Sequence, residues 1–289
     1  MTTLATLEYA PLELARPSIS EELSKLNLRR PSKHGSALLL ALLSPDVSAD
    51  ELHPLLLDPA IAHLAVEIQG FAWDVYGYTL FQAGRYAEAL KAYQEAIQLR
   101  PDYSEAHYDR GVVLIQLGRH QEALEAFEKA IQLSPDDPTA HNNRGVTLGQ
   151  LGRHQEALAA LETAYPLRRT TSEIVPKIYR ASSHISLLFG LSALKRRSLP
   201  DYEKATDAFI KWCNRARRDK QTAAFKQAVE EIKNALPAED KETFEEFMLG
   251  LRLMSIRDPF KAWDELAKLI SKDWPEGLSA VDAIRQERD

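Results

Sequence analysis

Apolar residues recur at intervals of three and four along most of the chain, which is the spacing of one face of an α-helix. No stretch shows the regular alternation of apolar and polar residues that a half-buried strand requires. Beyond residue 171 the pattern predicts helices over residues 172–197, 201–219, 221–236, 237–254 and 259–271, and a last one from residue 279. The hydrophobic pattern therefore predicts an all-α protein.

Short helices are also predicted ahead of residue 70. An apolar run from Ala37 to Leu43 is followed by Ser48-x-x-Glu51, which has the spacing of a capping box at the start of a helix. Asp58-Pro59 predicts a second helix start, since Asp suits the N-cap and Pro the first helical position. The apolar face of this second helix continues to Val75. We expect these helices to cap the N-terminal end of the segment that begins at residue 70.

One pattern of 34 residues is written three times in succession between Gly70 and Thr171. In each copy a Gly ends the first helix, and further small residues coincide at Gly77, Ala89, Gly111, Ala123, Gly145 and Ala157. A side chain larger than a methyl group at these positions would hold two crossing helices apart. The repeat therefore predicts three antiparallel helical hairpins, each of which buries its apolar face against the next.

The repeat resembles the tetratricopeptide repeat, whose pattern is Trp-x2-Leu-Gly-x2-Tyr, then Ala-x3-Phe, an Ala and a Pro. The first copy matches at Trp73, Tyr76, Gly77, Leu80, Ala89, Tyr93, Ala96 and Pro101. The third copy departs from the pattern, with Arg169 in the place of the Pro. The resemblance implies a right-handed solenoid of helical hairpins, with an N-terminal helical cap and additional C-terminal helices.

On this basis we expect five segments. They are a loosely ordered arm (1–34), N-terminal capping helices (35–69), three repeats (70–103, 104–137 and 138–171), a C-terminal capping helix (172–199) and a C-terminal helical region (200–289).

The resemblance further implies that the first helices of the repeats line a concave groove that binds a peptide or a helix of a partner protein. The expected lining is Asp74, Tyr78, Phe81, Glu105, Tyr108, Asp109, Val112, Ile115, Asn142, Asn143 and Val146. Asp74, Glu105 and Asp109 would then favour an amphipathic or basic segment. The Lys, Asn and Arg residues with which some family members hold C-terminal carboxylates are missing from the matching positions. The alternative is that the protein's own terminal segments cover this groove.

Charge is distributed unevenly. The chain of 289 residues has a formal net charge of -6, yet residues 168–220 contain 13 basic and 5 acidic residues, a net charge of +8. Lys204, Lys211, Arg215 and Arg218 share one face of a predicted helix, whereas Ala205, Phe209, Trp212 and Ala216 share the opposite face. We expect the basic face to meet an acidic protein surface, because few aromatic residues accompany the cations. Nucleic-acid binding is the alternative.

Chemical sites are not evident. Four of the eight histidines occupy equivalent repeat positions, and the others lack ligand spacing, so we expect no metal, no cofactor and no catalysis. A single cysteine, Cys213, fits a reducing compartment. The start of the chain does not resemble a signal peptide, so we expect a cytoplasmic protein. Residues 259–289 weakly resemble the neutralising tails of small bacterial antitoxins, which leaves a partner-neutralising role as an alternative. The sequence favours a non-catalytic interaction scaffold.

Overall fold

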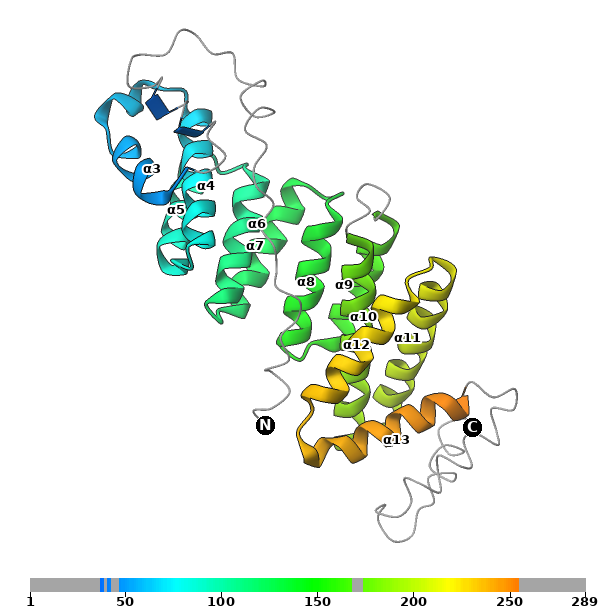
Figure 1. Cartoon of the computed structure of the whole chain (residues 1–289). Helices are drawn as coiled ribbons and strands as arrows, with labels where there is room; N and C mark the ends of the chain where they lie inside the picture. The colour runs from blue at the N-terminus through cyan, green and yellow to red at the C-terminus, as the bar shows by residue number, and fades with distance from the viewer. Residues whose placement is uncertain (1–36, 39–40, 43–46, 168–173, 255–289) are drawn as a thin grey trace. The chain divides into compact units, whose positions relative to one another are not determined.

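The computed structural model describes residues 37–38, 41–42, 47–167 and 174–254 (Figure 1). Within these ranges every regular element is helical. The elements are α3 (Ala49–Leu56), the 3₁₀ helix η1 (Pro59–His63), α4 (Val66–Gln82), α5 (Tyr86–Leu99), α6 (Ser104–Gln116), α7 (His120–Leu133), α8 (Pro138–Gln150), α9 (His154–Leu167), α10 (Ile174–Lys195), α11 (Leu199–Arg218), α12 (Thr222–Ala235) and α13 (Ala238–Met254). The fold is all-α, as predicted. The expected arm, the helices beyond residue 258 and the antitoxin-like tail lie outside the described residues.

Contacts divide the chain into two compact units with a boundary between Ile174 and Val175. We call the described residues up to 174 the repeat unit and residues 175–254 the C-terminal unit. The helix predicted to cap the repeats is α10, which from Val175 onward belongs to the C-terminal unit. Its capping role remains a prediction.

In the repeat unit the helices pair as α4 with α5, α6 with α7 and α8 with α9, and successive hairpins meet through α5 with α6 and α7 with α8 (Figure 1). A methyl group added at Gly77 would come within 2.9 Å of the Tyr93 ring, and one at Gly111 within 2.7 Å of the Phe127 ring. At Gly145 the nearest atom would be Leu161 Cγ at 3.1 Å. The prediction that these glycines mark close helix approaches is confirmed. The matching alanines, Ala89, Ala123 and Ala157, are all 0% exposed.

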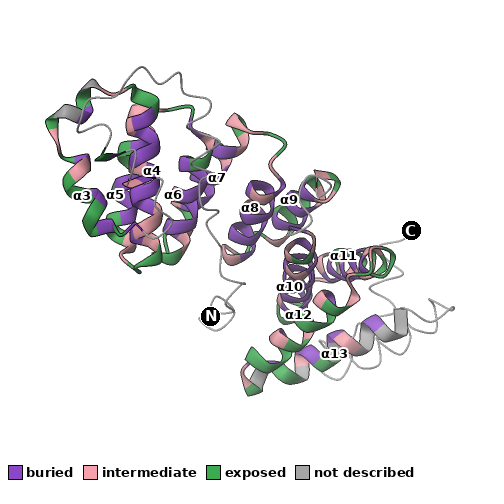
Figure 2. Cartoon of the chain, turned by 45° about the horizontal axis from the view of Figure 1, so that its top comes forward, coloured by how far each residue is buried: buried purple, intermediate pink, exposed green. Residues whose placement is uncertain are grey.

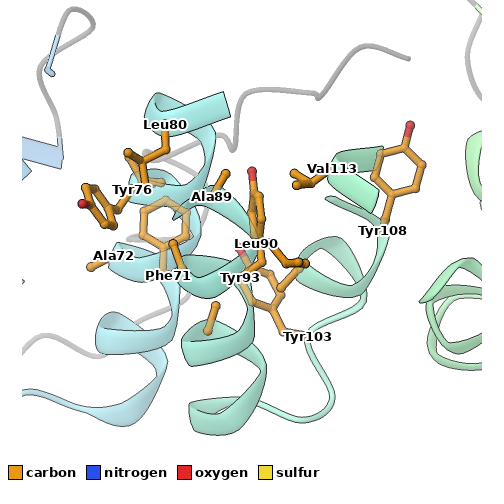
Figure 3. Packing of buried hydrophobic residues seen from close by; sticks show 14 of the residues in the cluster. Phe71, Ala72, Tyr76, Leu80, Ala89, Leu90, Tyr93, Tyr103, Tyr108 and Val113 are labelled. Atoms are coloured by element: carbon orange, nitrogen blue, oxygen red, sulfur yellow. The ribbon is translucent and has the colours of Figure 1, made fainter. Parts of the chain in front are cut away.

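Buried residues continue from one hairpin into the next (Figure 2). Phe71 and Leu80 of α4 pack with Tyr93 of α5, and Tyr103 and Val113 continue the same cluster around α6 (Figure 3). Each hairpin is amphipathic, so it buries its apolar surface only when a neighbour is present. The stack is therefore the stable unit.

The first helix of each repeat ends in the same backbone motif. Gly84, Gly118 and Gly152 have φ of +74°, +71° and +73°, a left-handed conformation that glycine adopts without steric cost. Gly84 N–H donates to the Phe81 carbonyl and Arg85 N–H to the Leu80 carbonyl, each at 2.9 Å. This Schellman pattern recurs after α6 and α8, and it turns the chain into the second helix.

The N-terminal segment shows one agreement and one correction. Ser48 Oγ accepts from Glu51 N–H at 3.3 Å while Glu51 accepts from Ser48 N–H at 3.0 Å, so the capping box is confirmed. The continuous helix predicted from Pro59 to Val75 is wrong. It is broken because Ala65 is extended (φ −55°, ψ 141°), and the Gln69 side chain donates to the Leu64 carbonyl at 2.7 Å across the break.

The C-terminal unit packs α10 to α13 around aromatic side chains. Tyr179 of α10 meets Trp212 of α11 edge to face with ring centroids 5.8 Å apart, and Phe209 meets Phe225 at 5.0 Å. Phe247 of α13 packs directly over Gly190, where an added methyl group would overlap the ring. Arg180 of α10 pairs with Glu231 of α12 at 2.9 Å. The helices of this unit are therefore joined by rings and by an ion pair.

Candidate protein-binding surfaces

The expected groove residues differ widely in their exposure. Glu105 is exposed, and Tyr78, Phe81 and Ile115 are half-buried. The other seven, Asp74, Tyr108, Asp109, Val112, Asn142, Asn143 and Val146, are buried. On the first helices, solvent therefore reaches only a few of the expected lining residues: Glu105 and, in part, Tyr78, Phe81 and Ile115.

The two buried carboxylates correct the expected chemistry. Asp74 is 0% exposed and accepts a hydrogen bond from the Tyr103 hydroxyl at 3.2 Å, and Asp109 is 3% exposed. Burial raises the pKa of the Asp109 carboxyl well above its usual value, and the charges of Asp74 and Glu105 raise it further. Asp74 and Asp109 are therefore not available on an open surface to set the sign of a ligand, and Glu105 is the exposed acid of the set.

Buried polar groups continue along α6 and α8. The Asn142 side chain donates to Asn143 Oδ1 at 3.2 Å, and Asn143 Nδ2 donates to the Tyr108 hydroxyl at 2.7 Å. Tyr108 also packs against Phe127 with ring centroids 5.7 Å apart. Tyr108, which the sequence places in the lining of the groove, is buried and joins two successive repeats.

A half-buried apolar strip remains on the first helices. Phe81 of α4 and Ile115 of α6 occupy the same position in successive repeats, and Tyr78 lies one turn before Phe81. All three pack partly against the core of the repeat unit. The Phe81 ring also meets Tyr86 of α5 at 5.3 Å. We call Tyr78, Phe81 and Ile115 the apolar strip.

Histidines in the repeats have structural partners. His107 Nε2 lies 3.0 Å from the Pro101 carbonyl, and His141 Nε2 lies 2.9 Å from the Pro135 carbonyl one repeat later. Burial lowers the pKa of His107, which favours a neutral ring. In the described part of the chain no group of His, Cys, Asp and Glu side chains could hold a metal ion.

The basic face predicted on α11 is present. Lys204, Lys211 and Arg218 are exposed, and the half-buried Arg215 guanidinium lies 4.8 Å from the centre of the Trp212 ring. The opposite face is buried, with Trp212 at 0% and Phe209 at 8% exposed. The prediction that these rings face a core is confirmed. Arg217 and Lys220, which the helical spacing alone does not single out, are exposed close by.

Stabilisation of the helix explains the presence of only some of these basic residues. Three arginines occupy the last turn of α11, where a cation beside the helix C-terminus contributes about 0.3 to 1 kcal/mol. Like charges three or four residues apart, as in Lys211, Arg215 and Arg218, oppose this by about 0.2 to 0.5 kcal/mol per pair. The two effects are comparable in size, so stabilisation of the helix end does not explain five basic residues here. They are Lys211, Arg215, Arg217, Arg218 and Lys220.

No helix in the described ranges is long and apolar enough to cross a membrane. Helices α4 to α9 pair into hairpins, and these hairpins repeat along the chain. The described part of the chain is an all-α protein in which a row of helical hairpins is followed by further helices.

Comparison with known families identifies the row of helical hairpins. Two tetratricopeptide repeat models match, one over residues 77–138 and the other over residues 114–174. Residues 77–174 of the chain therefore carry tetratricopeptide repeats. The comparison with curated proteins gave no match.

Three solved structures illustrate the similarity of the helical arrangement. One is the complex of the TPR2B domain of yeast Sti1 with pHsp70, at 21% identity and a TM-score of 0.40, with 41% of this chain and 97% of that chain covered. Another is MamA from Desulfovibrio magneticus RS-1, at 18% identity and a TM-score of 0.48, with 65% and 98% covered. A third, MamA AMB-1, has 24% identity and a TM-score of 0.41, with 53% and 88% covered.

Proposed function

We propose that this protein is a non-catalytic interaction scaffold whose repeat unit binds an amphipathic segment of a partner protein along the first helices of its repeats. The observation that carries the proposal is the apolar strip, because Phe81 and Ile115 occupy one repeat position, and the strip stays half-buried while most other expected lining residues are buried. Half-buried aromatic and aliphatic groups on rigid helices are suited to anchor a ligand.

The strip also explains why little rearrangement is needed for binding. Phe81 is held by Tyr86, and Tyr78 and Ile115 rest on the core, so their side chains are positioned before a ligand arrives. Pre-positioned anchors lose little conformational freedom on binding, which favours affinity. Glu105 adds one exposed negative charge on α6 and would favour a ligand with a basic residue at that end.

The proposed setting is the cytoplasm. It rests on the single cysteine, half-buried in α11, which fits a reducing compartment. The proposed role has no catalytic residue and needs no cofactor.

Affinity capture from an extract of the native host tests the proposal. The bait is the full chain, and bound proteins are quantified by mass spectrometry for the wild type and for Phe81→Ser combined with Ile115→Ser. Ile97→Ser combined with Ile131→Ser is the matched control, because these isoleucines are half-buried at one position of the second helices.

A specific partner should be depleted at least about tenfold by the first pair of substitutions, the loss expected for removing central anchors, and be retained by the control. Circular dichroism confirms that both variants are folded. If the partner were retained by the Phe81 and Ile115 variant, the binding surface would lie elsewhere.

A further inference from the structure

The C-terminal end of α11 gathers basic residues. Arg217, Arg218 and Lys220 are exposed, and in the described part of the chain none of them forms an ion pair. With Lys211 and Arg215 they place five basic residues within residues 211–220. We call these five residues the cationic end of α11.

The acids in this region have other partners. Asp219, the one acid within residues 211–220, accepts a hydrogen bond from the Tyr179 hydroxyl at 2.7 Å. Glu231 of α12 pairs with Arg180 of α10 at 2.9 Å. Residues 211–220 therefore hold five basic residues and one acidic residue, a net charge of +4.

Lys220 places one of these positive charges at an unfavourable backbone position. Its φ is +58°, and the next N–H, that of Gln221, donates to the Ala216 carbonyl at 2.8 Å. This is the helix-ending motif that the repeat unit builds with glycine, which has no Cβ to strain. A lysine is less suited to this conformation than glycine, so the turn itself does not require a cation here.

The aromatic residues of α11 indicate which kind of anion fits. Sequence-independent binding of single-stranded nucleic acid uses exposed aromatic rings on which bases stack. Trp212 is fully buried and Phe209 is 8% exposed, so the cationic end offers charge without a stacking surface. Its reach is also short, because ten helical residues span only about 15 Å.

We propose that the cationic end of α11 is a docking surface for a short segment of a partner protein rich in aspartate and glutamate, separate from the apolar strip. Arginine guanidinium groups bind carboxylates through two parallel hydrogen bonds, and Arg217 and Arg218 supply two such groups. The surface would steer and orient an acidic partner, and it would act most strongly at low salt.

Fluorescence anisotropy with the full chain tests this proposal. The probes are a fluorescein-labelled decapeptide of glutamate, a labelled ten-nucleotide single strand of mixed sequence and a labelled ten-base-pair duplex, each at about 50 and 150 mM salt. The variant carries Arg217→Gln, Arg218→Gln and Lys220→Gln. The control carries Lys91→Gln, Lys129→Gln and Lys241→Gln, which are exposed and change the net charge equally.

The decapeptide should bind the wild type and lose at least about tenfold in affinity in the variant, with a change below about twofold in the control. Tighter binding of either nucleic acid with the same residue dependence would replace the acidic segment by phosphate. Equal losses in variant and control would show that only the net charge matters, and no binding at the lower salt would also overturn the proposal. These substitutions leave the apolar strip intact, so the host-extract capture is judged independently.

Discussion

The repeat unit and the C-terminal unit end helices with the same motif but place different residues in it. After α4, α6 and α8 the left-handed position is Gly84, Gly118 or Gly152, whereas after α10 and α11 it is Arg197 (φ 53°) or Lys220 (φ 58°). An L-residue in this conformation costs roughly 1 to 2 kcal/mol relative to glycine. The repeat unit is thus fitted to its backbone at each turn, whereas the C-terminal unit retains cations at some expense of stability.

The two units also differ in what they bury. In the repeats a glycine lies under a ring or a leucine at each hairpin, whereas α10 has one such glycine, Gly190. The same helix buries Ser182, Ser183, His184 and Ser186, each at most 2% exposed. The repeat unit therefore uses the same close helix approach at every hairpin, whereas α10 uses it once, and both units bury polar side chains.

The largest expected effect comes from the close approach in the second repeat. Phe127→Ala should cost about 3 to 5 kcal/mol because it leaves a cavity, and Gly111→Leu about 1 to 3 kcal/mol because it overpacks the same space. The double variant should cost less than the sum of the two, by about 1 kcal/mol or more, since the leucine can enter the space of the ring. Denaturant unfolding followed by circular dichroism measures all three. Strict additivity, or an unchanged stability of Gly111→Leu, would contradict the packing.

Acid should weaken the C-terminal unit through His184. Burial, opposed by the Glu231 charge, lowers the pKa of His184 to about 4, against about 6.5 in the unfolded chain. Between these values the unfolded state binds more protons, so stability falls as the pH is lowered from 6.5 to 4, by about 3 kcal/mol. Unfolding free energies over this range should show the loss in the wild type and lack it in His184→Gln. A parallel pH profile of the two proteins would show that His184 is not the cause.

Asp109 in the repeat unit should have the opposite dependence. Because burial raises the pKa of its carboxyl, the folded state binds more protons than the unfolded state above the unfolded value of 3.8, and its contribution falls as the pH rises. Asp109→Asn should therefore stabilise the protein at pH 7 by about 1 to 3 kcal/mol, the usual size of the desolvation penalty of a buried polar group. The gain should vanish below pH 3.8.

Asp102→Asn is the matched control for this substitution, since Asp102 is exposed in the turn before α6. Thermal melts at neutral and acid pH compare the two variants. A destabilised Asp109→Asn variant would mean that the charged carboxylate has a favourable partner in the folded protein.

The smallest expected effects concern the helix ends. Gly118→Ala should cost about 1 kcal/mol, whereas Lys220→Gly should add about 1 kcal/mol of stability, because only glycine adopts the left-handed conformation without strain. Differential scanning calorimetry can resolve both signs. Equal and small effects at the two positions would remove the difference between the units.

Much of the fold could be predicted because its determinants are local or repeated. Gly111 and Ala123 recur at a fixed period, Ser48 and Glu51 are three residues apart, and Phe209 and Trp212 share a helical face. The repeated Gly-Arg-x-x-Glu pattern also indicates a local contact between its Arg and its Glu. Arg119 donates to Glu122 through two hydrogen bonds of 2.6 Å, and the same pair follows Gly84 and Gly152.

The surface of the repeats could not be predicted as well, because exposure depends on contacts that are distant in the sequence. Asp74 accepts a hydrogen bond from Tyr103, which lies 29 residues further along the chain, and Asn143 donates one to Tyr108 of the preceding repeat. Helical spacing places these residues on one side of a helix, but it does not show what covers that side. The break at Ala65 could not be predicted either, since its stabilising partner is the Gln69 side chain rather than a helix-breaking residue.

The central claim is that the first helices of the repeats carry the partner surface. Site-specific photo-crosslinking in the native host tests it directly, with p-benzoylphenylalanine placed at Phe81 or Ile115 and, for comparison, at Gln98 or Gln132, which are exposed at one position of the second helices. We predict that one partner is captured from positions 81 and 115 and not from positions 98 and 132. Capture of that partner from positions 98 and 132 alone would contradict the claim.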